Sequence, residues 1–277
     1  MKEIRSRVLK ARKKNKKIGF VPTMGALHEG HMSLIRRAIK ECGFVVVSIF
    51  VNPLQFGPRE DFGAYPRTLA RDRKILKNLG INVLFCPSGN EMFPEGYKTY
   101  VDVKGLGDVL CGKSRPDHFC GVATVVLKLF QIVVPDKAYF GLKDYQQYVI
   151  IQQMAEDLNL PIKVCGCPTV REKDGLAMSS RNVNLTKRER LEAPAIYSAL
   201  KSAKKEIISG RKNVNYIKSY ARRQISEKTS GRIDYFEVLD AGSLKDIKKT
   251  IKGRVLIATA VKFKKVRLID NIIFSLK

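Results

Sequence analysis

The sequence has no tryptophan, only 3 histidines in 277 residues, and no apolar run long enough to cross a bilayer. The longest apolar runs, residues 44–51 and 122–134, fall well short of the ~20 residues that a membrane-spanning helix needs. No apolar segment follows the basic stretch 1–17, so we expect neither a secretory signal nor a membrane association. We interpret this stretch as an amphipathic helix whose inward side chains are Ile4, Val8, Leu9 and Ala11.

Acidic residues are also scarce. The chain has 26 Asp and Glu residues against 52 Lys and Arg residues, which gives a formal net charge of +26 at pH 7. This balance favours anionic partners, whether nucleic acid, a membrane surface or a phosphorylated small molecule. The lysines gather in stretches 10–17, 201–223 and 245–265, which are poor in aromatic residues except around Tyr216 and Tyr220. We interpret them as solvated surface and expect no specific nucleic-acid partner.

Six cysteines occur without the spacing of a zinc or redox motif. Cys42, Cys86 and Cys165 lie in apolar surroundings, where a free thiol behaves as a small hydrophobic group. We expect all six to be reduced thiols of a cytoplasmic protein.

Short apolar segments alternate with helical patterns through the first two thirds of the chain. Strands are expected at 18–21, 44–51, 81–86, 137–140 and 162–167, with helices between them from about residue 31 and at 66–79, 122–133 and 144–158. This alternation predicts an α/β fold: a Rossmann-like, doubly wound parallel sheet that binds ligands at the carboxyl ends of its strands.

The last third changes character. Two lysine-rich helices, 187–209 and 213–228, precede three strands at 233–239, 254–261 and 266–273. Elements grouped in this way indicate a smaller α+β domain. We place the Rossmann-like domain at residues 1–171 and the smaller C-terminal domain at residues 172–277.

The first candidate site is the segment His28-Glu29-Gly30-His31, which follows the first expected strand and opens a helix. Its histidines share a helix face, whereas a lone histidine here would be interpreted as a cap or a surface residue. Gly30 lets a ligand approach the backbone. We expect free N–H groups and the positive end of the helix dipole to form an anion site. His-x-Gly-His at such a junction is typical of the class I nucleotidyl-transfer fold.

Three further segments carry candidate ligands. Met178-Ser179-Ser180-Arg181 offers hydroxyls and a guanidinium suited to a triphosphate, although an ordinary helix cap is the alternative. Lys143 can neutralise phosphate, and Asp144 can bind a ribose hydroxyl or Mg²⁺. Gln55 and Gln147 are neutral amides that could hold a small hydroxy acid. Each could be a solvated polar residue, but several fall where an open sheet binds its ligand.

Residues 21–31, VPTMGALHEGH, resemble the opening signature of the pantothenate synthetase (pantoate–β-alanine ligase) family. Residues 48–56, 115–126, 140–147 and 168–182 resemble further segments of that family in the same order. The resemblance implies a homodimer with a lid-like C-terminal domain. It also implies that ATP, with Mg²⁺, activates pantoate as a pantoyl adenylate, which then joins β-alanine and releases AMP and pyrophosphate.

The resemblance also assigns residues. It implies that ATP contacts Met24, Gly25, Ala26, Leu27, His28, Glu29, Gly30, His31, Gly141, Leu142, Lys143, Asp144, Val170, Met178, Ser179, Ser180 and Arg181. Pantoate and β-alanine are assigned to Gln55 and Gln147, with Met24, Asn52 and Arg115 nearby. Catalysis is assigned to His31, supported by His28 and Lys143, and the only metal ligand considered from the protein is Asp144.

Two positions depart from the family pattern, because Cys111 and Leu142 stand where glutamate is common. We interpret both as tolerated changes behind the binding site. Two rival functions remain. A small adenylyl- or cytidylyltransferase would share the histidine motif but lack a pocket built on Gln55 and Gln147. A basic nucleic-acid-binding protein would show aromatic residues interleaved with its lysines.

Overall fold

The computed structural model describes residues 1–58, 60–247 and 251–276. It divides into two compact units. The first comprises residues 1–142 and 146–168, and the second comprises residues 143–145 and 169–277. The division lies close to the boundary that we placed between 171 and 172, but the short segment 143–145 joins the second unit. Residues 248–250 of the lysine-rich stretch 245–265 lie outside the described residues.

The first unit contains a five-stranded parallel sheet in the order β3-β2-β1-β4-β5. The strands are β1 Ile18–Thr23, β2 Phe44–Ile49, β3 Val83–Phe85, β4 Lys137–Gly141 and β5 Lys163–Cys167. The predicted doubly wound sheet is therefore confirmed. The strand order reverses between β1 and β4, whose register covers only Gly19 with Lys137 and Phe20 with Ala138. The loops that leave β1 and β4 thus start at the switch point, where such sheets bind ligands.

Helices cover both faces of this sheet. The helices of this unit are α1 Lys2–Lys13, α2 Glu29–Glu41, α3 Leu69–Leu79, α4 Gly89–Met92, α5 Cys111–Ser114, α6 His118–Val133 and α7 Tyr145–Asp157, with the short 3₁₀ helix η1 Pro53–Gln55. A second 3₁₀ helix, η2 Leu142–Asp144, and the first residue of α7 include the segment 143–145 that belongs to the second unit. Helix α2 packs on one face through Ile35 and Ala38. Helix α6 packs on the other, where the Phe130 ring meets Phe20 and Phe140 edge-on.

Helix α1 is amphipathic as predicted, with one difference. Ile4, Val8 and Ala11 are buried, but Leu9 is 58% exposed. Leu9 follows Val8 by one residue and is therefore rotated about a quarter turn away from the buried stripe. The inward assignment of Leu9 was wrong.

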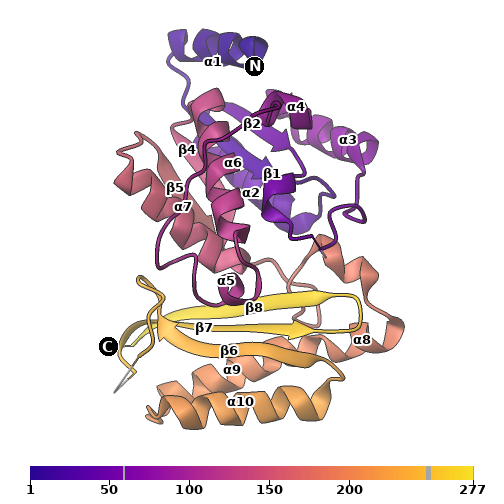
Figure 1. The fold of residues 1–277 in the computed structure, drawn as a ribbon, viewed down its shortest axis with the longest axis vertical. Coiled ribbons are helices and arrows are strands. Elements are labelled where there is room, and N and C mark those ends of the chain that lie inside the picture. The colour runs from indigo at the N-terminus through magenta and orange to yellow at the C-terminus, as the bar shows by residue number, and fades with distance from the viewer. Residues whose placement is uncertain (59, 248–250, 277) are drawn as a thin grey trace. The chain divides into compact units, whose positions relative to one another are not determined.

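The second unit is an antiparallel sheet in the order β6-β7-β8 with helices along one face (Figure 1). Its elements are η3 Ser180–Asn184, α8 Lys187–Glu192, α9 Pro194–Ile208, α10 Val214–Lys228, β6 Arg232–Asp240, β7 Gly253–Lys262 and β8 Arg267–Leu276. The predicted α+β domain is confirmed. The single helix expected at 187–209 is instead divided into α8 and α9. Pro194 begins α9, because proline lacks the N–H that a continuous helix requires.

The fold bears on two further expectations. All six cysteines are free thiols, as predicted. Across the described residues, no helix is both long enough and apolar enough to span a membrane.

Candidate active site

The loop that leaves β1 turns sharply before α2 begins. Gly25 and Ala26 have φ values of 82° and 49°, so two consecutive residues adopt the left-handed conformation. The Gly25 N–H donates to Thr23 Oγ1 at 3.2 Å, and that hydroxyl donates to the Ser48 carbonyl of β2 at 2.7 Å. The Ala26 and Leu27 N–H groups donate to the carboxylate of Asp72 at 2.9 and 3.0 Å. The loop is therefore held from below by side chains of its own unit.

His28 and His31 form the start of α2. His28 is the N-cap residue, and its Nδ1 accepts the Gly30 N–H at 3.2 Å. His31 completes a capping box, since its Nδ1 accepts the His28 N–H at 3.4 Å. The two rings lie face to face at a tilt, with centroids 4.1 Å apart. The structure thus brings both predicted histidines together.

The capping box corrects one expectation. We expected the N–H groups at the start of α2 to be free for a ligand, but those of His28 and Gly30 are occupied by imidazole nitrogens. Histidine caps compete with a ligand for these donors. Because each Nδ1 is an acceptor, the neutral rings carry their protons on Nε2. The histidines can therefore offer Nε2–H donors to an anion in place of the backbone.

Gln55, Met24 and Asn52 form the second cluster. The Gln55 Nε2 lies 3.0 Å from Met24 Sδ, and its Oε1 accepts from Asn52 Nδ2 at 3.1 Å. Asn52 is 1% exposed, and its amide also donates to the Gly121 carbonyl at 3.1 Å and accepts the Leu54 N–H at 3.2 Å. The bonds to Gly121 and Leu54 fix the Asn52 side chain, which in turn orients the amide of Gln55.

A glycine makes that arrangement possible. A Cβ on Gly121 would lie 2.2 Å from the Leu54 carbonyl oxygen, which is far inside van der Waals contact. Only glycine lets α6 approach η1 so closely. The first turn of α6 thereby becomes one wall of the Gln55 cluster.

Arg115 lies beside this cluster with most of its donors in use. It donates to both carboxylate oxygens of Glu60, at 2.7 and 2.5 Å, and to the Gln55 carbonyl at 3.3 Å. His118 Nδ1 lies 2.7 Å from the same carbonyl, and its Nε2 lies 2.9 Å from Arg115 Nη1. Since a carbonyl only accepts, Nδ1 carries the proton and Nε2 accepts from Arg115. Arg115 and His118 together fix the backbone of Gln55.

Glu60 is the counter-charge of this group. Burial raises the pKa of its carboxyl, but the hydrogen bond and the charge of Arg115 outweigh burial, so the pKa lies below its ordinary value. Glu60 is therefore ionised at neutral pH and neutralises Arg115. The sequence motifs indicated Arg115 but neither Glu60 nor His118.

The start of α7 carries two neighbouring glutamines with different environments. Gln147 is half-buried, whereas Gln146 is 6% exposed. The Gln146 side chain accepts the Cys111 N–H at 3.1 Å and donates to the Leu106 and Val109 carbonyls at 2.8 and 2.7 Å. Gln146 thus fixes the turn before α5, and Cys111 meets it through its backbone. A glutamate side chain at 111 is not needed for that contact.

Leu142 occupies space left by a glycine on the neighbouring strand. A Cβ on Gly166 of β5 would lie 2.6 Å from Leu142 Cδ2. Leu142 therefore packs over the backbone of Gly166. An apolar side chain fits this place, which accounts for the departure from glutamate.

In the second unit, Lys143 and Asp144 belong to a segment fastened to the sheet. The Lys143 carbonyl accepts from Asn271 Nδ2 of β8 at 2.8 Å, and the Tyr145 hydroxyl donates to the Ala241 carbonyl at 3.0 Å. The Lys143 ammonium lies 3.8 Å from the Asp144 carboxylate. Lys143 is 19% exposed at its side chain and Asp144 48%. The backbone carrying both charges is fixed by Asn271 and Tyr145, neither of which was predicted as a site residue.

The segment 169–182 brings together the remaining predicted residues. The Met178 N–H donates to the Val170 carbonyl at 3.0 Å, and Arg171 pairs with Ala177 in a short antiparallel bridge. Ser179 caps η3, with its Oγ accepting the Arg181 N–H at 3.2 Å. The helix-cap alternative for Ser179 is therefore observed. It places Ser180 and Arg181 on the first turn of η3.

This segment is anchored to β8 by a buried ion pair. Arg171 makes a two-pronged contact with Asp270 at 2.6 and 2.9 Å, and its guanidinium lies 3.4 Å from the centroid of the Tyr197 ring. The side chains of Arg171 and Asp270 are 16% and 6% exposed. Such a planar fork fixes the position of the backbone it comes from. Val170 and Met178 are thereby held to one place in the second unit.

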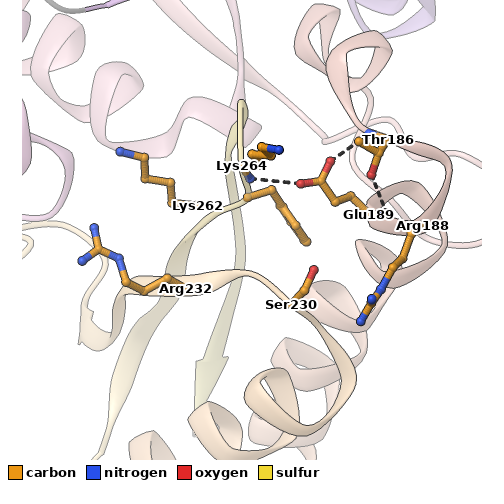
Figure 2. Close-up of a pocket in the computed structure, with 8 residues that line it drawn as sticks. Thr186, Arg188, Glu189, Ser230, Arg232, Lys262 and Lys264 are labelled. Atoms are coloured by element: carbon orange, nitrogen blue, oxygen red, sulfur yellow. Dashed lines mark hydrogen bonds between the residues drawn. The ribbon is translucent and has the colours of Figure 1, made fainter.

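A hollow of about 520 Å³ on the second unit contains none of the predicted site residues. It is lined by Thr186, Arg188, Glu189, Ser230, Arg232, Lys262, Phe263 and Lys264. Figure 2 shows Arg232 and Lys262 extending on one side and Arg188 on the other, so the charges do not converge. Glu189 serves the capping box of α8 and accepts the Lys264 N–H at 3.0 Å. We interpret the hollow as a packing gap between α8 and the sheet and not as a binding site.

These features define a class: an α/β enzyme with a Rossmann-like sheet and polar loops gathered at the carboxyl ends of its strands. A family model for pantoate-β-alanine ligase matches residues 1–273. The chain therefore belongs to the pantoate–β-alanine ligase family and is a ligase.

Relatives and solved structures agree. The chain is 51% identical over 277 residues to pantothenate synthetase of Caldicellulosiruptor bescii, covering 100% of this chain and 97% of the relative. The Thermus thermophilus pantoate–β-alanine ligase structure superposes with a TM-score of 0.90 at 45% identity, covering 96% of each chain. The Francisella tularensis enzyme, solved with β,γ-ATP and β-alanine, gives a TM-score of 0.76 at 38% identity, covering 97% of this chain and 95% of that one.

Proposed function

We propose that this chain condenses pantoate with β-alanine in two ATP-dependent steps. The pantoate carboxylate attacks the α-phosphorus of ATP and forms a pantoyl adenylate with release of pyrophosphate. The amine of β-alanine then attacks the acyl carbon and releases AMP. Membership of the family carries the proposal. The Francisella relative, solved with an ATP form and β-alanine, supports the choice of substrates.

Neither step requires a nucleophile from the protein, so the residues must position substrates and stabilise charge. As negative charge moves onto the leaving pyrophosphate, the Nε2–H groups of His28 and His31 are the donors proposed to follow it. The capping box supports this role because it holds both rings by Nδ1. Donors that are fixed before the reaction cost no reorganisation when charge develops.

Gln55 and Gln147 are proposed to bind the hydroxyls and carboxylate of pantoate. Asn52, Arg115 and His118 support Gln55 by fixing its amide and its backbone carbonyl. Arg115 therefore acts on the substrate through Gln55, because Glu60 already neutralises its charge. This pocket also separates the proposal from a nucleotidyltransferase, which would need room for a second nucleotide.

The second unit is proposed to supply the triphosphate contacts. Lys143 carries a positive charge, and Ser179, Ser180 and Arg181 follow the anchored strand pair at Val170 and Met178. We propose that this unit acts as a lid that excludes water from the adenylate, which would otherwise hydrolyse. The anchors at Arg171 and Asn271 support the role by keeping these residues together as the lid moves.

Mg²⁺ is proposed to arrive with ATP. Among the described residues, no group of three or more His, Cys, Asp or Glu side chains is placed to hold a metal ion. The residues therefore fit an ion held chiefly by phosphate oxygens, with Asp144 as the one candidate carboxylate. Mg²⁺ bound in this way would neutralise phosphate charge.

Two further properties belong to the proposal. We propose a homodimer, which light scattering at several protein concentrations would test. We also propose a cytoplasmic location, supported by the six free thiols, which fit a reducing compartment.

Pyrophosphate–ATP isotope exchange tests the proposed function. With Mg²⁺ and pantoate but without β-alanine, labelled pyrophosphate should enter ATP, because adenylation is reversible. Other hydroxy acids of similar size should support slower exchange. Exchange that ignores pantoate, or that requires a nucleotide monophosphate as acceptor, would refute the proposal in favour of a nucleotidyltransferase.

A further inference from the structure

The turn between β1 and α2 has an unusual support. Its two left-handed residues, Gly25 and Ala26, lie next to each other, and an alanine adopts φ 49° only when its surroundings hold it there. The loop cannot rely on a strand partner at this point, since β1 ends at Thr23. Something outside the loop must therefore fix its shape.

Asp72 provides that support from α3. It is 0% exposed, and its two oxygens act separately. Oδ2 accepts the Ala26 N–H at 2.9 Å, and Oδ1 accepts the Leu27 N–H at 3.0 Å. Thr68 Oγ1 donates to Oδ2 at 3.1 Å. The two carboxylate oxygens thus accept from two consecutive backbone amides, while the Thr68 hydroxyl fixes the orientation of the carboxylate.

The contact leaves little freedom in the loop. A Cβ placed on Gly25 would lie 3.2 Å from Asp72 Oδ2 and 3.1 Å from Ile49 Cγ2, so the backbone lies directly over the carboxylate. Leu27 is itself 1% exposed and precedes the N-cap residue His28. A displacement of Leu27 would therefore move the capping box that holds both imidazoles.

We propose that Asp72 is a positioning residue for adenylation, which sets the β1–α2 turn and through it the Nε2–H groups of His28 and His31. The inference rests on the proposed function for its effect on catalysis, but its structural part does not. A negative charge below a loop that receives triphosphate would ordinarily repel the ligand. Here the charge is buried and balanced by N–H and O–H dipoles, so it shapes the loop.

Asp72→Asn is the direct test. An amide has one acceptor oxygen, so one of the two backbone N–H groups must face an NH₂ donor. We expect KM for ATP to rise and the adenylation rate to fall together by about 100-fold, the loss that a displacement of ~1 Å causes in a positioned site. KM for β-alanine should change less than about twofold, because a local displacement affects only the groups that it moves.

Matched variants separate position from fold. Thr68→Val removes the donor that orients the carboxylate and should shift KM for ATP in the same direction but by less, whereas Thr68→Ser keeps the hydroxyl and should behave as wild type. Asp157→Asn makes the same chemical change on α7, where an exposed carboxylate accepts from Gln153 at 2.7 Å, and should alter neither parameter. Thermal unfolding of each variant checks that it folds.

Amide hydrogen exchange supplies a readout that does not depend on catalysis. In wild type the Ala26 and Leu27 amides should both be protected, and Asp72→Asn should lose the protection of at least the one amide that faces the NH₂ group. If wild type shows no pantoate-dependent exchange of pyrophosphate into ATP, the proposed function fails. Amide protection and the affinity for a non-hydrolysable ATP analogue would still test the role of Asp72 in the loop. Wild-type KM for ATP in Asp72→Asn would overturn the inference, as would equal losses for every substrate together with a general loss of protection.

Discussion

Replacing Glu60 with glutamine isolates the charge that supports the Gln55 cluster. The change keeps the size and shape of the side chain but removes the carboxylate that Arg115 contacts through two nitrogens. The side chains of Arg115 and Glu60 are 17% and 27% exposed, so water can replace only part of the lost interaction. A partly buried guanidinium would remain without its counter-charge.

The loss can be bounded from the two contacts. Hydrogen bonds to charged groups contribute about 1.5–3 kcal/mol, and removing one partner of a fully buried pair costs about 3–5 kcal/mol. Because the pair is partly solvated and glutamine keeps one acceptor, we expect the free energy of unfolding to fall by about 2 kcal/mol at neutral pH. For a unit of this size, the melting temperature should fall by roughly 4–8 °C.

The pH dependence of stability shows whether the charge of Glu60 is responsible. The folded pKa of Glu60 lies below its ordinary value, so the stabilisation is fully present above the unfolded pKa. It is lost as pH falls through the folded pKa, when the wild-type carboxyl becomes neutral. The difference in stability between wild type and Glu60→Gln should therefore shrink in acid.

Urea unfolding at neutral and acidic pH measures this difference, with KM for pantoate measured beside it. We expect KM for pantoate to rise while KM for ATP stays close to wild type, because Arg115 and His118 hold the Gln55 backbone. Glu3→Gln is the control, since it removes an exposed ion pair with Arg7 on α1 and should have little effect. A stability difference that is absent at neutral pH, or unchanged in acid, would refute the reasoning.

Three other predictions follow from the site. His31→Ala should lower the single-turnover adenylation rate by about 10²–10³ with the fold retained, and a near wild-type rate would show that another group stabilises the charge. Gln147→Leu should weaken pantoate far more than ATP in equilibrium binding, because hydroxyls in the pocket lose their partner; equal losses would assign it to the fold. The +26 charge should give only sequence-blind nucleic-acid binding that fades with salt to a Kd on the order of 10⁻⁴–10⁻⁶ M, and one duplex held tightly at physiological salt would contradict this.

Much of the fold could be predicted because each strand of the parallel sheet is a short apolar run. Residues 45–48 in the middle of β2 are buried, and residues 44–51 form an almost continuous hydrophobic run, as parallel strands often do. The break at Pro194 shows the limit, since lysine-rich helical periodicity continued across it. The inward assignment of Leu9 was wrong for a similar reason, because its apolar character alone did not determine which side of α1 faces the core.

The candidate site could likewise be predicted only in part. His28, His31, Gln55 and Met24 were predicted, because they stand in compact motifs at strand ends, and the structure brings them together in two clusters. Asn52 and Arg115, which support Gln55, were also predicted, but other supports were missed. Asp72 lies 45 positions beyond Leu27, and His118 lies 63 beyond Gln55, so only the folded chain makes them neighbours. The use of the N–H groups of His28 and Gly30 for capping also could not be read from residue types alone.

The most direct test of the central claim follows an oxygen atom. Pantoate labelled with ¹⁸O in its carboxylate is converted with ATP and β-alanine, and the products are analysed by mass spectrometry. If the carboxylate attacks the α-phosphorus, one labelled oxygen remains on the phosphate of AMP when the amine displaces it, and none enters pyrophosphate. Label in pyrophosphate or inorganic phosphate, with AMP unlabelled, would contradict the pantoyl adenylate.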